Sequence, residues 1–233
     1  MEVNVNNLVQ SVKAIILLYA KPERIYVYGS FVDDQAGRCN DIDIAYDDCK
    51  FKDHFLIVND IEKINTLIKI DVHNIASAEK RFKERVKSTG KVIYSATKQL
   101  RAEDGLYNFS KALKKFGDIV EGEAELNEAG FGDLYLDLVV KRFEFTFEMS
   151  WKALKRYLSY LGIEAQSPRM VFKEAYSQEI ILDEAIWLDM IEQRNLSSHI
   201  YDEFEIKGIL TKKKEYKKAF TQLEIKIKKG IKE

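Results

Sequence analysis

A glycine-serine pair that precedes two aspartates at a fixed distance restricts the fold of this sequence more than any other feature. Gly29 and Ser30 end a strand-like run, and after ten further residues Asp41 and Asp43 flank an isoleucine in a second such run. Side chains two positions apart in a strand point to the same face, so the two carboxylates would project together. An acidic turn is the simpler interpretation of Asp-x-Asp alone.

The spacing of these residues favours phosphate chemistry. Paired carboxylates bind hard divalent cations such as Mg²⁺, which prefer oxygen ligands. The glycine lets the backbone approach a phosphate closely, and amides at the turn can donate to its oxygens. Together these parts suit an enzyme that attacks a nucleoside triphosphate at its α-phosphorus.

The composition is that of an ordinary globular chain. Its 233 residues are 46% hydrophobic and 32% charged, with a formal net charge of −1. This length suits one large domain or two small ones, and the charge gives no global attraction to nucleic acid. No apolar run approaches the ~18 residues that span a bilayer, and Cys39 and Cys49 have neither metal-like spacing nor a preceding signal peptide. We therefore expect a cytoplasmic protein with reduced thiols and no membrane partner.

The periodicity of apolar residues divides the chain into two parts. Strand candidates alternate with helical patterns in the first hundred residues, and helical spacing dominates after a polar junction. The strand candidates are 24–29, 41–46, 69–75 and 91–94, and an amphipathic helix is expected near 53–68. We predict an α/β domain with a mixed sheet at 1–96, a linker at 97–104 and an all-α helical bundle at 105–233.

The clearest helix of the second part is expected from Asp133 to Leu161, where an apolar stripe continues over the whole length. Gly162 then ends it, and Ser167-Pro168 is typical of an N-cap followed by a first-turn proline. Asp183 is expected to cap a further helix, and the last helix is expected at 220–231. We interpret the aromatic residues of the stripe as core.

The first part resembles the polymerase-β-like nucleotidyltransferases, specifically their minimal branch, whose pattern is Gly-Ser-x10-Asp-x-Asp. Gly29, Ser30, Asp41 and Asp43 match this pattern position for position. The family also has a third acidic residue on a later strand, and Asp71 is the only acid in the strand-like run that follows. The resemblance implies ATP as substrate, two Mg²⁺ ions held by the three aspartates, and β- and γ-phosphates bound at the glycine and serine.

One short segment departs from that family. Val32, Asp33 and Asp34 stand where a small residue and a glycine usually follow the glycine-serine pair, and Gly37 comes only later. This departure concerns the placement of the triphosphate and leaves the carboxylates of the metal site unaffected.

A second reactive set, Arg194, His199 and Tyr201, lies near the end of the helix that Asp183 begins. The arginine could stabilise a phosphorane-like transition state, and the histidine could act as acid or base on a ribose hydroxyl. At ~100° per residue, Arg194 and Tyr201 lie nearly on one helical face, while His199 is offset from Arg194 by about 140°. The histidine therefore meets the arginine only if the helix ends there or a second subunit contributes. A surface arginine with a capping histidine is the simpler alternative.

Arg-x4-His with the polar Asn195 after the arginine resembles the motif of HEPN-domain ribonucleases, small helical bundles that usually dimerise to build their active site. With Tyr201 added, the motif is similar to that of HEPN toxins paired with minimal nucleotidyltransferase antitoxins. In those pairs, AMP passes from ATP to this tyrosine and silences the ribonuclease. The segment 141–152 is similar to the branch called nucleotidyltransferase substrate-binding proteins.

The resemblance implies catalytic roles for Arg194, Asn195 and His199 in a metal-independent ribonuclease, with Tyr201 as the AMP acceptor. It also implies a homodimer, RNA as a candidate partner, and transfer to the helical domain of the same or a neighbouring subunit. Two partners that are usually separate would then lie on one polypeptide.

Two alternatives remain open. Aminoglycoside-type nucleotidyltransferases also join this catalytic domain to a helical bundle, which helps to bind a small molecule. Alternatively, the first part is only a binding module and the bundle a dimerisation scaffold. Metal-dependent ATP turnover separates this last interpretation from the other two.

Overall fold

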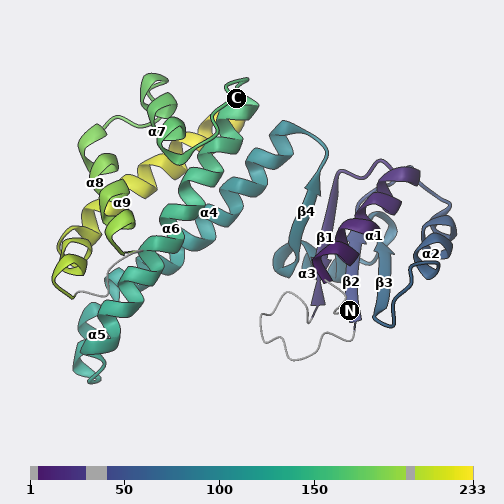
Figure 1. Cartoon of the computed structure of the whole chain (residues 1–233), viewed down its shortest axis with the longest axis horizontal. Coiled ribbons are helices and arrows are strands. Elements are labelled where there is room, and N and C mark those ends of the chain that lie inside the picture. Colours follow the sequence, from purple (N-terminus) through teal and green to yellow (C-terminus); the bar gives the residue numbers. More distant parts are fainter. Residues whose placement is uncertain (1–4, 30–40, 198–202, 233) are drawn as a thin grey trace. The chain divides into compact units, whose positions relative to one another are not determined.

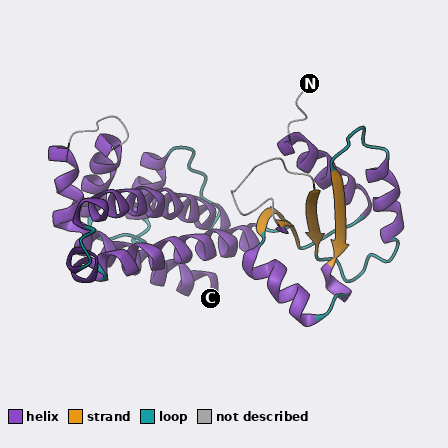
Figure 2. Cartoon of the chain, turned by 90° about the horizontal axis from the view of Figure 1, so that it is seen from below, coloured by secondary structure: helices purple, strands orange, loops and turns teal. Residues whose placement is uncertain are grey.

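The chain consists of two compact units, Met1–Leu100 and Arg101–Glu233. The computed structural model describes residues 5–29, 41–197 and 203–232 (Figure 1). In these residues the first unit combines a sheet with helices, and the second unit is helical (Figure 2). This confirms the predicted fold class, an α/β part followed by an all-α part.

The first unit is a mixed four-stranded sheet with the order β3-β2-β1-β4. Strand β1 pairs with β2 and β4 in antiparallel orientation, and β2 pairs with β3 in parallel orientation. A parallel pair needs a crossover, and α2 supplies it. The elements are α1 (Val5–Tyr19), β1 (Arg24–Tyr28), β2 (Asp41–Tyr46), α2 (His54–Glu62), β3 (Lys69–Asn74), the 3-10 turn η2 (Ile75–Ser77), α3 (Lys80–Thr89) and β4 (Lys91–Ser95).

The two faces of the sheet are covered differently, because alternate residues of each strand point to opposite sides. One face buries Ile42 and Ile44 of β2 in a cluster that includes residues of α1 and α2. The other face buries Tyr26, Tyr28 and Ala45 against η2 and α3. Strand parity therefore places Asp41 and Asp43 on the same side as α3, near one end of the sheet.

The second unit is a bundle whose core is rich in aromatic rings. Phe143 contacts Phe116, Phe147, Tyr216 and Phe220, with ring centroids 5.0–6.4 Å apart. Helix α6 packs against α7 and α9, and α8 packs against α9. The helices are α4 (Lys98–Glu121), α5 (Glu123–Glu128), α6 (Gly132–Tyr160), α7 (Pro168–Ser177), α8 (Glu184–Ser197) and α9 (Glu203–Lys232).

Most expected helix ends of this unit are confirmed. Helix α6 is capped by Leu161, and Gly162 follows with a φ of 86°. Ser167 accepts a hydrogen bond from the amide of Met170, with Pro168 at the first helical position. The Asp183 side chain accepts from the amide of Ile186 at 3.2 Å.

Two helix boundaries differ from the expectation. Helix α2 ends at Glu62 instead of near 68, because the segment returns to β3 and Thr66 accepts a local hydrogen bond from the amide of Ile68. Residues 98–104 belong to α4 and consist largely of strong helix formers, while the linker expected at 97–104 stays a prediction. Helix α9 begins at residue 203 instead of 220, because Ile209 and Tyr216 continue its buried face toward the N-terminus.

Along the stretches that the structure describes, no helix is both long and apolar enough to cross a membrane.

Candidate active site

The three predicted carboxylates lie on two neighbouring strands. Asp41 and Asp43 belong to β2, and Asp71 belongs to β3. The register of the parallel pair places Asp43 directly beside Asp71 and Asp41 beside Lys69. Asp41 is exposed, whereas Asp43 and Asp71 are half-buried. The fold therefore gathers on one face of the sheet the acids that the sequence distributes over thirty residues.

The carboxylates repel one another. Partial burial, followed by the negative charges of Asp41 and Asp71, raises the pKa of Asp43 above its ordinary value. The nearby His73 and Lys69 oppose this shift, and the ammonium of Lys69 lies 2.6 Å from a carboxylate oxygen of Asp71. A bound cation would relieve the repulsion among these carboxylates.

The residues that end β1 lie directly against this cluster. Gly29 has a φ of 76°, a left-handed backbone conformation that residues other than glycine rarely adopt. A Cβ atom at this position would lie 2.2 Å from an oxygen of Asp43. The backbone conformation therefore favours glycine, and any larger residue would also displace the carboxylate of Asp43. Ser30 lies outside the described residues.

The three carboxylates are chemically suited to bind a divalent metal ion, although they do not converge on a common position. Three carboxylates supply the oxygen ligands that Mg²⁺ prefers. The raised pKa of Asp43 reflects its burial first and repulsion from Asp41 and Asp71 second. Within the described residues, no three His, Cys, Asp or Glu side chains already surround a common position for a metal. Asp71 is instead paired with Lys69.

Tyr28 and His73 form a pair beside the carboxylates that the sequence analysis did not predict. The hydroxyl of Tyr28 lies 3.1 Å from Nδ1 of His73, and both rings contact the edge or face of Phe82. Burial, followed by the charge of Asp43, raises the pKa of Tyr28 to about 12, so this hydroxyl stays protonated. The alternation of Lys69, Asp71 and His73 along one strand was a signal for the position of His73, but not for its contact with Tyr28, which depends on strand order.

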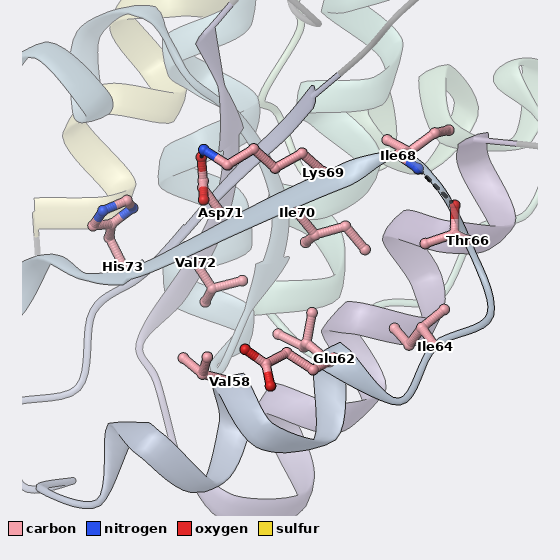
Figure 3. A pocket seen from close by; sticks show the side chains of 11 residues that line it. Val58, Glu62, Ile64, Thr66, Ile68, Lys69, Ile70, Asp71, Val72 and His73 are labelled. Atoms are coloured by element: carbon pink, nitrogen blue, oxygen red, sulfur yellow. Dashed lines mark hydrogen bonds and ion pairs between the residues drawn. The ribbon is translucent and has the colours of Figure 1, made fainter.

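A cleft of about 420 Å³ runs beside β3 (Figure 3). Figure 3 shows Lys69, Asp71 and His73 on one side of the strand and Ile70 and Val72 on the other. The cleft wall is completed by α2 and by the segment that leads into β3. The lining residues are Val58, Ile61, Glu62, Ile64, Thr66, Ile68, Lys69, Ile70, Asp71, Val72 and His73.

In the second unit, Arg194 and Asn195 lie in the last turn of α8, and Arg194 donates to the Asn195 side chain at 3.4 Å. Arg194 also acts on Glu148 of α6. Burial opposes the ionisation of Glu148, but hydrogen bonds from Lys152 and Trp151 and the charges of Lys152 and Arg194 outweigh it and lower its pKa. His199 and Tyr201 lie outside the described residues, so their roles stay predictions.

A separate cavity of about 310 Å³ lies between α7 and α8. Aromatic and aliphatic side chains form most of its wall, including Phe172, Tyr176 and Trp187. The charged residues in the wall are Arg169, Lys173 and Glu184.

Each of the two units matches a known protein family. A family described as polymerase beta nucleotidyltransferase matches residues 10–99. A family described as nucleotidyltransferase substrate binding protein like matches residues 104–229, more than half of the 233-residue chain. The chain belongs to the nucleotidyltransferase substrate-binding-protein-like family. It carries that domain behind a nucleotidyltransferase domain on the same polypeptide. The protein is thus a nucleotidyltransferase, and its substrate is a nucleotide.

Similarity to individual proteins is limited. No curated protein matches the chain significantly. A crystal structure of a protein from Thermus thermophilus shares 28% sequence identity, with a TM-score of 0.44. That similarity covers 51% of this chain and 98% of the other.

Proposed function

We propose that this nucleotidyltransferase transfers AMP from ATP to the hydroxyl of Tyr201 in its own substrate-binding domain, in the same or a neighbouring subunit. The observation that carries this proposal is the register of Asp43 and Asp71 on adjacent strands, directly beside Gly29. A carboxylate cluster next to a phosphate-binding turn suits transfer at an α-phosphorus. The fused domain supplies the Arg194-x4-His199-x-Tyr201 motif.

Each residue has a distinct role in this reaction. Asp41, Asp43 and Asp71 would hold two Mg²⁺ ions, which when bound neutralise triphosphate charge and make the attacking hydroxyl more acidic. Backbone amides at Gly29 and Ser30 bind the β- and γ-phosphates. Lys69 keeps Asp71 in place until the nucleotide arrives, since the two already form an ion pair.

The transfer step conserves atoms and charge as follows. The phenolic oxygen of Tyr201 forms a bond to the α-phosphorus of ATP, and the bond from that phosphorus to the bridging oxygen of the β-phosphate breaks. Pyrophosphate leaves with the bonding electrons. Asp71 accepts the phenolic proton and passes it to solvent.

Modification would silence a ribonuclease in the helical unit. AMP adds a phosphodiester charge and a purine close in sequence to Arg194 and His199, which we propose to act with Asn195 on RNA. Charge repulsion and steric exclusion would then keep RNA away. A short tether between enzyme and acceptor commonly gives an effective concentration around the millimolar range, so modification soon after synthesis is expected.

A small-molecule acceptor is the second candidate, and the cavity between α7 and α8 is the observation that favours it. Its aromatic wall and size suit a compact ligand. Two cationic side chains and one acidic side chain lie in that wall. This balance suits an anionic aromatic compound better than a polycationic aminoglycoside.

Labelled ATP tests the proposal. The full chain is incubated with Mg²⁺ and ATP labelled at either the α- or the γ-phosphate. We expect label from the α-phosphate alone to stay on the protein, to disappear in Tyr201→Phe and to persist in Tyr107→Phe, whose tyrosine is 45% exposed. Label that persists in Tyr201→Phe would assign another acceptor. An absence of any ATP turnover would support the binding-module alternative.

A further inference from the structure

Strand β3 is the edge of the sheet nearest to the carboxylates. The strand order is β3-β2-β1-β4, so β2 occupies one side of β3, and in the described part of the chain no strand occupies the other. Free edges of this kind are templates for an added strand from a peptide. The carboxylate of Asp71 projects from this same edge strand, beside that of Asp43.

The cleft beside β3 follows this free edge, because its wall includes side chains from both faces of the strand (Figure 3). On one face, Lys69, Asp71 and His73 present charge and hydrogen-bonding groups. On the other face, Ile68, Ile70 and Val72 form an apolar wall with residues of α2. An extended peptide along this edge would therefore meet a polar surface on one side and an apolar surface on the other.

We propose that the β3 edge binds the acceptor as an added strand: an extended polypeptide segment in which a hydroxyl side chain follows a branched aliphatic one. The hydroxyl lies on the carboxylate face near Asp71, and the aliphatic side chain enters the apolar part of the cleft. This inference rests on the proposed function, since it names how the acceptor of that same site is recognised.

The alternation of side chains makes this binding mode selective. Consecutive residues of a strand point to opposite faces, so one register satisfies both requirements at once. In this sequence Ile200 precedes Tyr201, and in an added strand His199 would fall on the same side as the tyrosine. A histidine on that side could donate a hydrogen bond to a carboxylate of the cluster.

The peptide is proposed to pair with the first half of β3. The ring of His54 hydrogen-bonds to the backbone of Val72, toward the carboxyl end of the strand. The segment from Ile68 to Asp71 is the part that borders both the apolar wall and the carboxylates.

Two variants of the full chain test the cleft. Ile68→Asp introduces a charge into the apolar wall, and Leu67→Asp places the same charge on its neighbour, which is fully exposed and outside the wall. We expect Ile68→Asp to slow AMP transfer to protein at least about tenfold, from the lost burial of one aliphatic side chain. Leu67→Asp should transfer at the parental rate. Equal ATP affinity and melting temperature in both variants exclude a folding defect, and equal transfer by both would overturn the proposal.

A second measurement identifies strand addition itself. The probe is a synthetic peptide with the sequence of residues 196–204, offered with ATP and Mg²⁺ to the full-length Tyr201→Phe protein. Methylation of one backbone nitrogen at a time removes one hydrogen-bond donor, so we expect modification of the peptide to be lost at alternate positions only. Uniform loss or uniform tolerance would overturn strand addition, and so would a failure of the unmethylated peptide, carrying a fluorophore, to bind.

The proposed function and the proposed docking mode can fail separately. AMP transfer to Tyr201 of the parent protein, without alternation in the methylated peptides, would retain the proposed function and remove the docking mode. Alternating binding of a fluorescent version of the peptide, without AMP transfer, would retain the docking mode and remove the proposed function.

Discussion

At the scale of single residues, Asp43 is the clearest case in which a residue needed for function lowers the stability of the fold. Its pKa is raised, so the fold favours the neutral form, and the stabilising contribution of that form is lost as pH rises through the folded pKa. At neutral pH the ionised Asp43 is therefore a source of repulsion that a metal ion relieves.

Asp43→Asn should therefore have opposite effects on activity and stability. We expect AMP transfer to fall at least about a hundredfold, since a metal contact worth several kcal/mol is lost. Without Mg²⁺ at neutral pH, the melting temperature should rise by a few degrees, because the repulsion from Asp41 and Asp71 is removed. Transfer assays and thermal melts of the variant and the parent measure both effects.

Asp53→Asn is the matched control, because Asp53 is exposed and its side chain makes no capping hydrogen bond. It should change neither quantity. Retention of transfer by Asp43→Asn would remove Asp43 from the metal site.

Gly29→Ala tests the contact between the turn and the carboxylates. The substitution combines a left-handed backbone with a Cβ atom 2.2 Å from an oxygen of Asp43. We expect a loss of stability greater than the ~1–2 kcal/mol of the backbone conformation alone, together with loss of transfer.

Gly130→Ala separates these two costs. Gly130 has a similar φ of 81°, but an added Cβ would have no neighbour within 4 Å. This variant should show the backbone cost alone and retain transfer. Equal destabilisation of the two variants in denaturant titrations would mean that the contact with Asp43 is unimportant.

The sequence predicted the polar residues of the site where local spacing determined their placement. Asp41 and Asp43 share a face because they are two apart in one strand, and strand parity is a local property. The ion pair of Lys69 with Asp71 also joins residues two apart in one strand, but it was not predicted. The contact between Tyr28 and His73 depends on strand order, which local periodicity does not encode.

At the scale of elements, the end of α1 is joined to the turn before α2 by one buried carboxylate. Asp48 accepts hydrogen bonds from the amides of Lys21, Lys50 and Phe51 at 2.8–3.2 Å. Burial by itself would raise the pKa of Asp48, but the backbone hydrogen bonds outweigh it and hold the pKa below its ordinary value of 3.8.

Asp48→Asn should destabilise the first unit in a manner that depends on pH. The ionised carboxylate accepts all three amides, whereas an amide side chain offers one oxygen, so we expect a loss of about 1–3 kcal/mol at pH 7. A lowered folded pKa gives stability that is present above the ordinary value and lost as pH falls through the folded value. The difference between variant and parent should therefore shrink below pH ~4. A difference that is constant from pH 7 to pH 3 would contradict this assignment.

Element boundaries were predictable where a residue stops an element by its own chemistry. Pro168 and Gly162 do so at two ends in the second unit. The early end of α2 and the early start of α9 were not predictable in this way. Tertiary packing decides both, since one segment must return to the sheet and the other continues a buried face.

At the scale of the whole molecule, a nucleotidyltransferase domain and a substrate-binding domain are joined on one chain. The nucleotidyltransferase match ends at residue 99 and the substrate-binding match begins at residue 104. Helix α4 begins at Lys98, so the connection is largely helical. The expected domain limits, 96 and 105, stay a prediction. Enzyme and acceptor cannot be separated by loss of one partner, and the acceptor is therefore expected to be modified by default.

AMP transfer to Tyr201 is tested by the intact mass of the purified full chain, measured before and after incubation with ATP and Mg²⁺. We predict a mass that exceeds the sequence mass by whole AMP units, either on purification or after incubation. Asp43→Asn and Tyr201→Phe should both keep the unmodified mass. A parent protein without any adduct under both conditions, or an adduct of the same size on Tyr201→Phe, would contradict AMP transfer to Tyr201.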